Sequence, residues 1–287
     1  MRTTFEPRLE VNGQPASLEQ LWGMDLAARS HFTAMQVRGR ATLGLEFHLT
    51  RLDAATREMF GTGLDGEMVR GYIRHALGDG IADASVRVHV FRPGATVANL
   101  ASANPASANL ASAGASAAGG TGAVSVLVTV RRPAAPAGRP ERLRLVTYQR
   151  PLAHLKHGGS YGQNFFGGLA EASGFDDALF ASPDGVISES SIANIAVADG
   201  EALVWPDAPA LRGVMMQVLQ RELDRAGMPW RYGPVRVADL PRFSGALVTN
   251  SHGLAAVAAI GDLELPAGGP VVSAAAAALE AAPYDPL

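Results

Sequence analysis

Hydrophobic and polar residues alternate in several short segments, and each such segment is expected to form a strand. The clearest spans residues 85–91, where Val86, Val88 and Val90 share one face and polar side chains share the other. Similar patterns predict strands at 32–38, 43–47, 123–130, 143–148, 178–181, 192–198, 202–205, 246–249 and 254–260, and a short one within 5–13. Strands are therefore expected along the whole chain.

Hydrophobic residues spaced three and four apart predict helices between these strands. Residues 66–78 show this spacing and end at a glycine, which is a common helix terminus. Residues 211–226 have a strongly amphipathic pattern, and further helices are expected before Phe60 and at 163–173 and 273–282. Because both halves of the chain mix strands and helices, the predicted fold class is α+β (mixed α/β), in two domains.

Two segments interrupt the pattern. Residues 93–122 are rich in Ala, Ser, Gly and Asn, and the hexapeptide Ala-Asn-Leu-Ala-Ser-Ala occurs in them twice. With no charged residue and almost no large apolar residue to bury, this segment is expected to be a mobile loop near the mouth of a site. Residues 132–140 are rich in Pro, Ala and Gly and read as a linker. The expected division is an N-terminal domain, 1–131, and a C-terminal domain, 141–287.

The composition narrows the class of protein. Of 287 residues, 47% are hydrophobic and 18% charged, as in a globular protein with a buried core. The formal net charge of −3 gives no reason to expect nucleic acid as a partner. The absence of cysteine excludes disulfides and thiolate metal sites, and no metal is expected. Neither a signal-peptide pattern nor a run of about 18 apolar residues is present, so a cytoplasmic protein outside the membrane is expected.

Lys156 is the residue with the most distinctive chemistry. It is the only lysine, since 23 of the 24 basic residues are arginine, and two glycines follow it closely in Lys-His-Gly-Gly. Arginine stays protonated in proteins, whereas a partly buried lysine amine can lose its proton and attack a carbonyl. Lys156 is therefore a candidate for Schiff-base chemistry, and an ordinary surface lysine is the alternative.

Glu189 lies 33 residues after Lys156, among small hydroxyl residues that follow an Asp-Gly turn. A carboxylate held there can pair with a cationic ring nitrogen, as a cofactor that withdraws electrons requires. A solvent-facing turn glutamate is the alternative. The segment Arg212-Gly-Val-Met215 opens a helix, and the free N–H groups of a helix start bind phosphate. Arg51 and the Thr249-Asn250-Ser251 segment offer further phosphate contacts.

Taken together, these segments resemble a known family. The ordered motifs are His48-Leu-Thr-Arg-Leu, Leu155-Lys-His-Gly-Gly-Ser-Tyr, Ser188-Glu-Ser-Ser-Ile-Ala-Asn-Ile, Arg212-Gly-Val-Met and Thr249-Asn-Ser. They resemble the fold-type IV pyridoxal-phosphate enzymes, which are the class IV aminotransferases. The resemblance covers about residues 9–262. Lys-x-Gly-Gly-x-Tyr is close to the branched-chain aminotransferases, whereas Leu-Lys-His and Gly213-Val-Met are closer to the 4-amino-4-deoxychorismate lyases.

The resemblance implies a two-domain D-amino-acid-aminotransferase-like fold, pyridoxal 5'-phosphate as cofactor and a homodimer. It implies that Lys156 holds the cofactor as a Schiff base and moves the proton during catalysis. It gives the remaining positions these roles: Glu189 at the pyridine nitrogen, Tyr161 near the ring hydroxyl, Arg87 at the substrate carboxylate, and Arg51, the backbone of Val214 and Met215, and Asn250 at the phosphate.

The chain departs from the family pattern at two places. Residues 25–31 stand where the family has Asp-Arg-Gly followed by Gly-Asp-Gly, and the Arg-x-His pair of D-amino-acid aminotransferases is missing from the region of the 93–122 insert. The expected activity is amino-group transfer between an amino acid, branched-chain-like or other, and a 2-keto acid. Elimination of pyruvate, as in the lyases, and a non-catalytic cofactor-binding protein are the alternatives.

Overall fold

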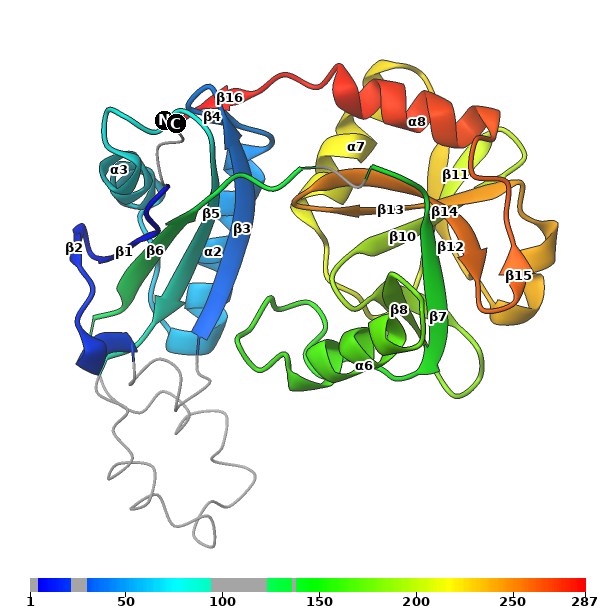
Figure 1. Cartoon of the computed structure of the whole chain (residues 1–287), viewed down its shortest axis with the longest axis horizontal. Helices are drawn as coiled ribbons and strands as arrows, with labels where there is room; N and C mark the ends of the chain where they lie inside the picture. Colours follow the sequence, from blue (N-terminus) through cyan, green and yellow to red (C-terminus); the bar gives the residue numbers. More distant parts are fainter. Residues whose placement is uncertain (1–4, 22–29, 94–122, 136–137) are drawn as a thin grey trace, which may run out of the picture. The chain divides into compact units, whose positions relative to one another are not determined.

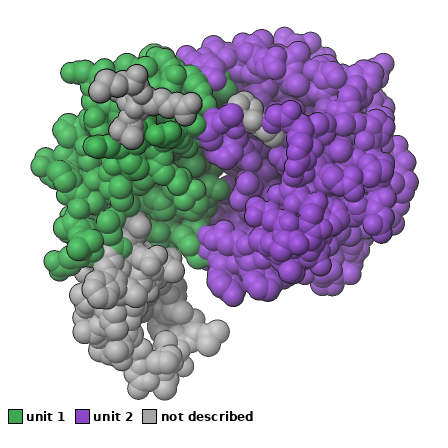
Figure 2. Space-filling model, in the orientation of Figure 1, with its two compact units in different colours: residues 1–133, 156–159, 286–287 green, residues 134–155, 160–285 purple. Residues whose placement is uncertain are grey.

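The structure is a computed structural model that describes residues 5–21, 30–93, 123–135 and 138–287 (Figure 1). The chain forms two compact units (Figure 2): unit 1 comprises residues 1–133, 156–159 and 286–287, and unit 2 comprises 134–155 and 160–285. Among the described residues, no helix has the length and apolar character needed to cross a membrane. The expectations for the 93–122 insert and for residues 25–31 fall almost wholly outside the described residues.

Unit 1 contains a seven-stranded sheet with the strand order β16-β4-β3-β5-β6-β1-β2. The central strands β3, β5, β6 and β1 are antiparallel to their neighbours. The strands are β1 (Arg8–Val11), β2 (Gln14–Pro15), β3 (Ser30–Arg38), β4 (Ala41–Thr42), β5 (Ala84–Phe91), β6 (Ser125–Arg131) and β16 (Asp285–Pro286).

Two helices, α2 (Leu45–Phe60) and α3 (Gly66–Leu77), cover one face of this sheet. The predicted alternation in β5 is confirmed, because Val86, Val88 and Val90 are buried in the core that these helices close. The predicted strand at 43–47 is wrong. Gly44 adopts a left-handed conformation (φ 65°), and α2 begins at the next residue.

Unit 2 contains a nine-stranded sheet with the order β12-β11-β10-β13-β14-β7-β8-β9, and β15 pairs with β14. An additional pairing of β9 with β10 closes part of the sheet on itself. The strands are β7 (Glu141–Thr147), β8 (Asp177–Ala181), β9 (Ile187–Ser190), β10 (Asn194–Asp199), β11 (Ala202–Pro206), β12 (Trp230–Gly233), β13 (Gly245–Asn250), β14 (Gly253–Ile260) and β15 (Leu263–Glu264).

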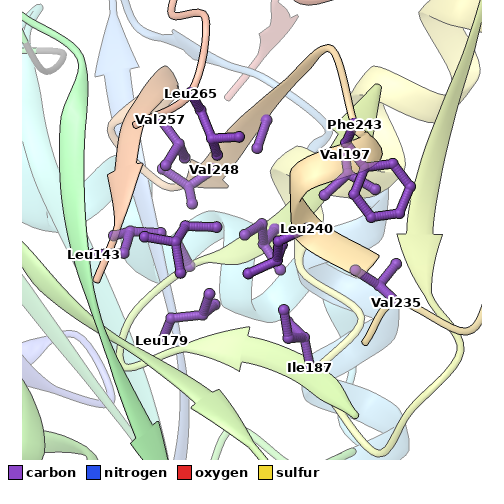
Figure 3. Packing of buried hydrophobic residues seen from close by; sticks show 14 of the residues in the cluster. Leu143, Leu179, Ile187, Val197, Val235, Leu240, Phe243, Val248, Val257 and Leu265 are labelled. Carbon is purple, nitrogen blue, oxygen red and sulfur yellow. The ribbon is translucent and has the colours of Figure 1, made fainter. Parts of the chain in front are cut away.

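The main core of unit 2 is made of aliphatic side chains from these strands and from the 3-10 helix η2 (Val237–Arg242). Figure 3 shows residues such as Leu143, Leu179 and Val248 converging there. Outside it lie α6 (Tyr161–Ala172), α7 (Val214–Arg225) and α8 (Pro270–Glu280). Both units mix strands and helices, which confirms the predicted α+β class.

Residues 156–159 group with unit 1, although the sequence analysis assigned all of 141–287 to one C-terminal domain. The reason is a short pairing with the start of β3. The Phe32 N–H donates to the Lys156 carbonyl (2.8 Å), and the Gly158 N–H donates to the Ser30 carbonyl (2.6 Å). These backbone bonds fix the segment that carries the lysine against a central strand.

Candidate functional site

Lys156 lies beside β3 of unit 1. Its carbonyl is bound by Phe32, and its Nζ lies 4.9 Å from the centre of the Phe32 ring. An ammonium group over an aromatic face is attracted by the ring quadrupole. The backbone pairing and the ring together give the Lys156 amine a defined position in unit 1.

Arg51, on α2, belongs to a buried polar network. Its Nη2 donates to the Thr33 hydroxyl, and the Thr33 hydroxyl lies 2.5 Å from Nδ1 of His48. Because the Thr33 oxygen accepts from arginine, its proton is free to go to His48, whose Nδ1 then acts as an acceptor. Burial, followed by the charges of Arg51 and Lys156, lowers the pKa of His48 well below its usual value, so His48 is neutral.

Arg51 itself carries a buried charge that the described residues do not neutralise. Burial lowers the pKa of its guanidinium to about 10. Its Nε is buried without a hydrogen-bond partner, and no carboxylate of the described residues forms an ion pair with it. Buried charges are normally paired. An anion bound at Arg51 would supply the missing partner.

Arg87 projects from β5 toward the same ring as Lys156. Its guanidinium carbon lies 5.0 Å from the centre of the Phe32 ring, and its Nε is buried without a partner among the described residues. Lys156 and Arg87 are therefore neighbours in unit 1, with Phe32 as their common contact.

Glu189 lies in β9 of unit 2, at the pairing of β9 with β10 that closes the sheet. The sequence analysis placed it after a turn and did not assign a strand there. Its Oε1 accepts from Nε of Arg150 (2.8 Å), and its Oε2 accepts from the Leu211 N–H (3.0 Å). Both side chains of the Arg150–Glu189 pair are nearly inaccessible, at 4% and 6% exposed.

Arg150 was not identified from the sequence. Besides Glu189, it donates to the carbonyl of Leu155 (2.6 Å) and to that of Ala153. The Leu155 carbonyl belongs to the peptide bond that joins Leu155 to Lys156. Arg150 therefore holds both the Glu189 carboxylate and the backbone that leads into Lys156.

Asn194 of the neighbouring strand β10 binds the backbone just before α7. Asn194, on β10, accepts from the Gly213 N–H (3.1 Å) and donates to the Leu211 carbonyl (2.6 Å). A Cβ on Gly213 would collide with Oδ1 of Asn194, so this close approach requires glycine. No side chain caps the helix, which leaves the N–H groups of Val214 and Met215 available to an anion.

Asn250 ends β13 and accepts from the His252 N–H (2.8 Å), which orders the turn into β14. The hydroxyl of the preceding Thr249 is buried without a partner among the described residues. Tyr161 begins α6, and its ring stacks on Phe165 with the centroids 6.1 Å apart. The Tyr161 side chain is 80% exposed, and no described residue of unit 2 holds it near the other predicted positions.

The structure brings only some of the predicted residues together. In unit 1, Lys156 and Arg87 share the ring of Phe32, whereas Arg51 lies with Thr33 and His48 on the side of the sheet that α2 covers. In unit 2, Glu189 is connected to the start of α7 through residues 211–213. The residues that sequence reasoning missed are Thr33, His48, Arg150 and Asn194. For two of them the sequence position could have served as a signal. Arg150 precedes Lys156 by six residues, and Asn194 belongs to the motif that begins at Ser188 and contains Glu189.

Comparison with known proteins gives a consistent result. A model of the family described as amino-transferase class IV matches residues 30–260. No curated protein matches the chain. Among solved structures, a branched-chain aminotransferase from Thermoproteus uzoniensis, solved with norvaline, aligns with a TM-score of 0.79 and 15% identity, over 96% of this chain and 94% of the other.

Two further solved structures are similar over nearly their full lengths. A hypothetical aminotransferase from Mycobacterium tuberculosis, in its PLP-bound form, aligns with a TM-score of 0.77 and 20% identity, over 96% of this chain and 98% of the other. A Legionella pneumophila protein provisionally named 4-amino-4-deoxychorismate lyase aligns with a TM-score of 0.76 and 17% identity, over 93% and 95%. At these identities the likeness shows the fold. Because the family match covers most of the chain, this protein belongs to the class IV aminotransferases, a family of pyridoxal-phosphate enzymes with the mixed α+β fold of type IV.

Proposed function

We propose that this chain is a pyridoxal-phosphate-dependent aminotransferase that moves an amino group between an amino acid and a 2-keto acid through Lys156. The observation that carries the proposal is the placement of the only lysine. Its backbone is bound to β3, its Nζ lies against Phe32, and the peptide bond before it accepts a hydrogen bond from Arg150. No other residue in the chain can supply a primary side-chain amine.

Each unit, taken by itself, has polar groups that fit a phosphate. Among the described residues, Arg51 has a buried Nε without a partner, Thr249 has a buried hydroxyl without one, and α7 begins without a side-chain cap. Each of these groups is a hydrogen-bond donor without an acceptor, and a phosphate oxygen is a suitable acceptor. The family resemblance assigns Arg51, the backbone N–H groups of Val214 and Met215, and the Asn250 side chain to phosphate binding, and the proposal keeps that assignment.

When bound, pyridoxal phosphate supplies an electron sink that makes the substrate α-carbon acidic. Glu189 would keep the ring nitrogen protonated, and each of its oxygens, which accepts one hydrogen bond from the described residues, retains a lone pair for that contact. Lys156 Nζ, as the free amine, would accept the substrate α-proton as general base and later donate it as general acid. Tyr161 is assigned to the ring hydroxyl and Arg87 to the substrate carboxylate.

The test is a half-reaction without a keto-acid acceptor. Wild-type protein, incubated with a panel of L- and D-amino acids, is expected to release at most one equivalent of keto acid per chain. Glu189→Gln should release it far more slowly, and Arg74→Gln, on the exposed surface of α3, should match wild type. No keto acid from any donor would refute transamination. Release of pyruvate from aminodeoxychorismate would then support the lyase activity, and neither product would support a binding protein.

We also propose a homodimer. The exposed residues Tyr161, Phe165 and Leu169 form a stripe along α6 at a spacing of four, an apolar surface suited to a second chain. Sedimentation at micromolar concentration should give the mass of two chains. A single monomeric species that is fully active would refute this part of the proposal.

A further inference from the structure

A cavity of about 280 Å³ lies within unit 2, beside the start of α7. Its walls come from β9, β10, β11 and β12, from the segment 207–212, and from Met216 of α7. Of the described residues that line it, none is among those expected to hold the cofactor, which are Arg51, Lys156, Tyr161, Glu189, Val214, Met215 and Asn250. The cavity therefore needs an explanation of its own.

Two aromatic residues line this cavity from one face of the sheet. Trp205 of β11 is paired directly with Tyr232 of the parallel strand β12, so the two side chains point to the same face. The preceding Val204 belongs to the main core of unit 2, which lies on the other face. Gln220 of α7 donates to the Tyr232 hydroxyl (3.0 Å). The face that carries Trp205 and Tyr232 is therefore the one that α7 covers.

The indole of Trp205 has a donor without an acceptor. Trp205 is fully buried, and its Nε1 forms no hydrogen bond with the described residues. An indole nitrogen can only donate, and a buried donor that stays unsatisfied destabilises the fold. A molecule in the cavity that carries an acceptor oxygen would satisfy it.

Two further donors belong to the same cavity. The Tyr232 oxygen accepts from Gln220 and from Nη2 of Arg212 (3.4 Å), so its own proton remains available to a ligand. The Arg212 guanidinium also lies over the Tyr232 ring, 5.9 Å from its centre. Asp207 lines the cavity as well, but it is exposed, and water weakens the effect of its charge. Donors and a cation thus meet at one end of the cavity.

The remaining walls are mostly apolar, and they include Ile195, Pro206, Ala208, Ala210, Leu211 and Met216. A water molecule takes roughly 30 Å³ in the liquid, so a cavity of 280 Å³ has room for a molecule of roughly nine heavy atoms. We infer that the cavity binds a small organic carboxylate with an apolar tail, whose oxygens accept from Trp205, Tyr232 and Arg212. This site goes beyond the proposed function, because it uses neither Lys156 nor the cofactor.

The experiment follows the indole N–H of Trp205 by two-dimensional ¹⁵N–¹H NMR of protein saturated with pyridoxal phosphate. The chain has three tryptophans, and Trp205→Phe identifies the resonance of Trp205 by its loss. The titrated ligands are 4-methylpentanoate and 4-methylpentanamide, which has nearly the same shape without the charge. Each is added to wild type, Arg212→Gln and Tyr232→Phe. Arg231→Gln is the matched control, because Arg231 is exposed on the same strand as Tyr232 and binds Asp199 (2.7 Å).

In wild type, 4-methylpentanoate is expected to shift the Trp205 resonance until the site is saturated, with an affinity at least roughly tenfold higher than that of the amide. Arg212→Gln should weaken binding of the acid by about that factor, because a charge-assisted hydrogen bond is lost. Tyr232→Phe should weaken it too, and Arg231→Gln should leave it unchanged.

Three results would overturn the inference. The first is a Trp205 resonance that does not respond, as in a cavity that holds only water. The second is equal binding of the acid and the amide, or equal losses in Arg212→Gln and Arg231→Gln. The third is a response that disappears in Arg87→Gln and persists in Arg212→Gln, because the acid would then occupy the position proposed for the substrate. The proposed function fails separately, through absence of keto acid in the half-reaction.

Discussion

Replacement of Arg150 by methionine is expected to destabilise unit 2 more than a surface substitution does. Arg150 binds Glu189, Leu155 and Ala153, and its side chain is 4% exposed. Methionine fills a similar volume but donates no hydrogen bond. The variant leaves the Glu189 carboxylate buried with the Leu211 N–H as its only described donor, and it leaves two carbonyls without their arginine contacts.

The expected loss follows from this burial. Removing one partner of a buried ion pair costs roughly 3–5 kcal/mol, because the remaining charge is desolvated without compensation. We do not add a separate free-energy cost for the lost hydrogen bonds to the two carbonyls, because the contributions of groups in contact are not additive. For a cooperative unit of roughly 150 residues, this corresponds to a fall of about 10–15 °C in melting temperature.

The assay is a double-mutant cycle in thermal and urea unfolding. Arg150→Met/Glu189→Met removes the stranded charge together with its partner, so it should be more stable than Arg150→Met. Arg142→Met is the control, because its ion pair with Glu264 in the same unit is 43% and 70% exposed, and it should lose no more than about 1 kcal/mol. If the double variant is less stable than Arg150→Met, or the control loses as much, the reasoning about the buried pair is wrong.

Three further substitutions test other parts of the account. Gly213→Ala should weaken cofactor binding, because the new Cβ would collide with Oδ1 of Asn194 and displace the start of α7. Equilibrium dialysis measures this affinity, and an unchanged value would show that the close contact between Gly213 and Asn194 does not matter for binding. Burial lowers the pKa of His31 to about 4, so between about pH 4 and 6.5 the unfolded chain binds more protons and stability must fall as the pH falls. His31→Gln should make the urea midpoint depend less steeply on pH in this range, with the rest of the dependence coming from His48 and His89, whose pKa values are lowered too. An unchanged slope would contradict the assignment. Glu189→Gln should keep the cofactor but slow keto-acid release at least roughly 100-fold, because a neutral amide holds the ring nitrogen protonated less well; an unchanged rate would make Glu189 structural.

The local sequence pattern was sufficient to predict several helices and strands and to identify Lys156 as a candidate for Schiff-base chemistry. The alternation in β5 and the helical spacing of α3 and α7 were read correctly, because each depends on which face the core covers. Lys156 could be identified because it has no competitor in the composition. A resemblance in motif order then led to the family, which the match over residues 30–260 confirms.

Sequence reasoning failed where a long-range contact decides the structure. Leu43, Leu45 and Phe47 alternate, but the left-handed Gly44 starts a helix whose buried face includes His48 and Thr56, polar residues that obscure the helical pattern. Glu189 was placed after an Asp-Gly turn with no strand assigned to it, because its pairing with Asn194 across β9 and β10 leaves no local pattern in the sequence. Arg150 was missed for the same reason, since its partner is 39 residues away.

The most direct test of the central claim is the site of covalent cofactor attachment. Purified protein is supplied with pyridoxal phosphate, reduced with borohydride, digested and analysed by mass spectrometry. The account predicts one phosphopyridoxyl group per chain, on Lys156, and none on Lys156→Arg, which keeps the positive charge but cannot form the bond. A wild-type protein that carries no reducible cofactor, or a Lys156→Arg protein that still carries it, would contradict the account.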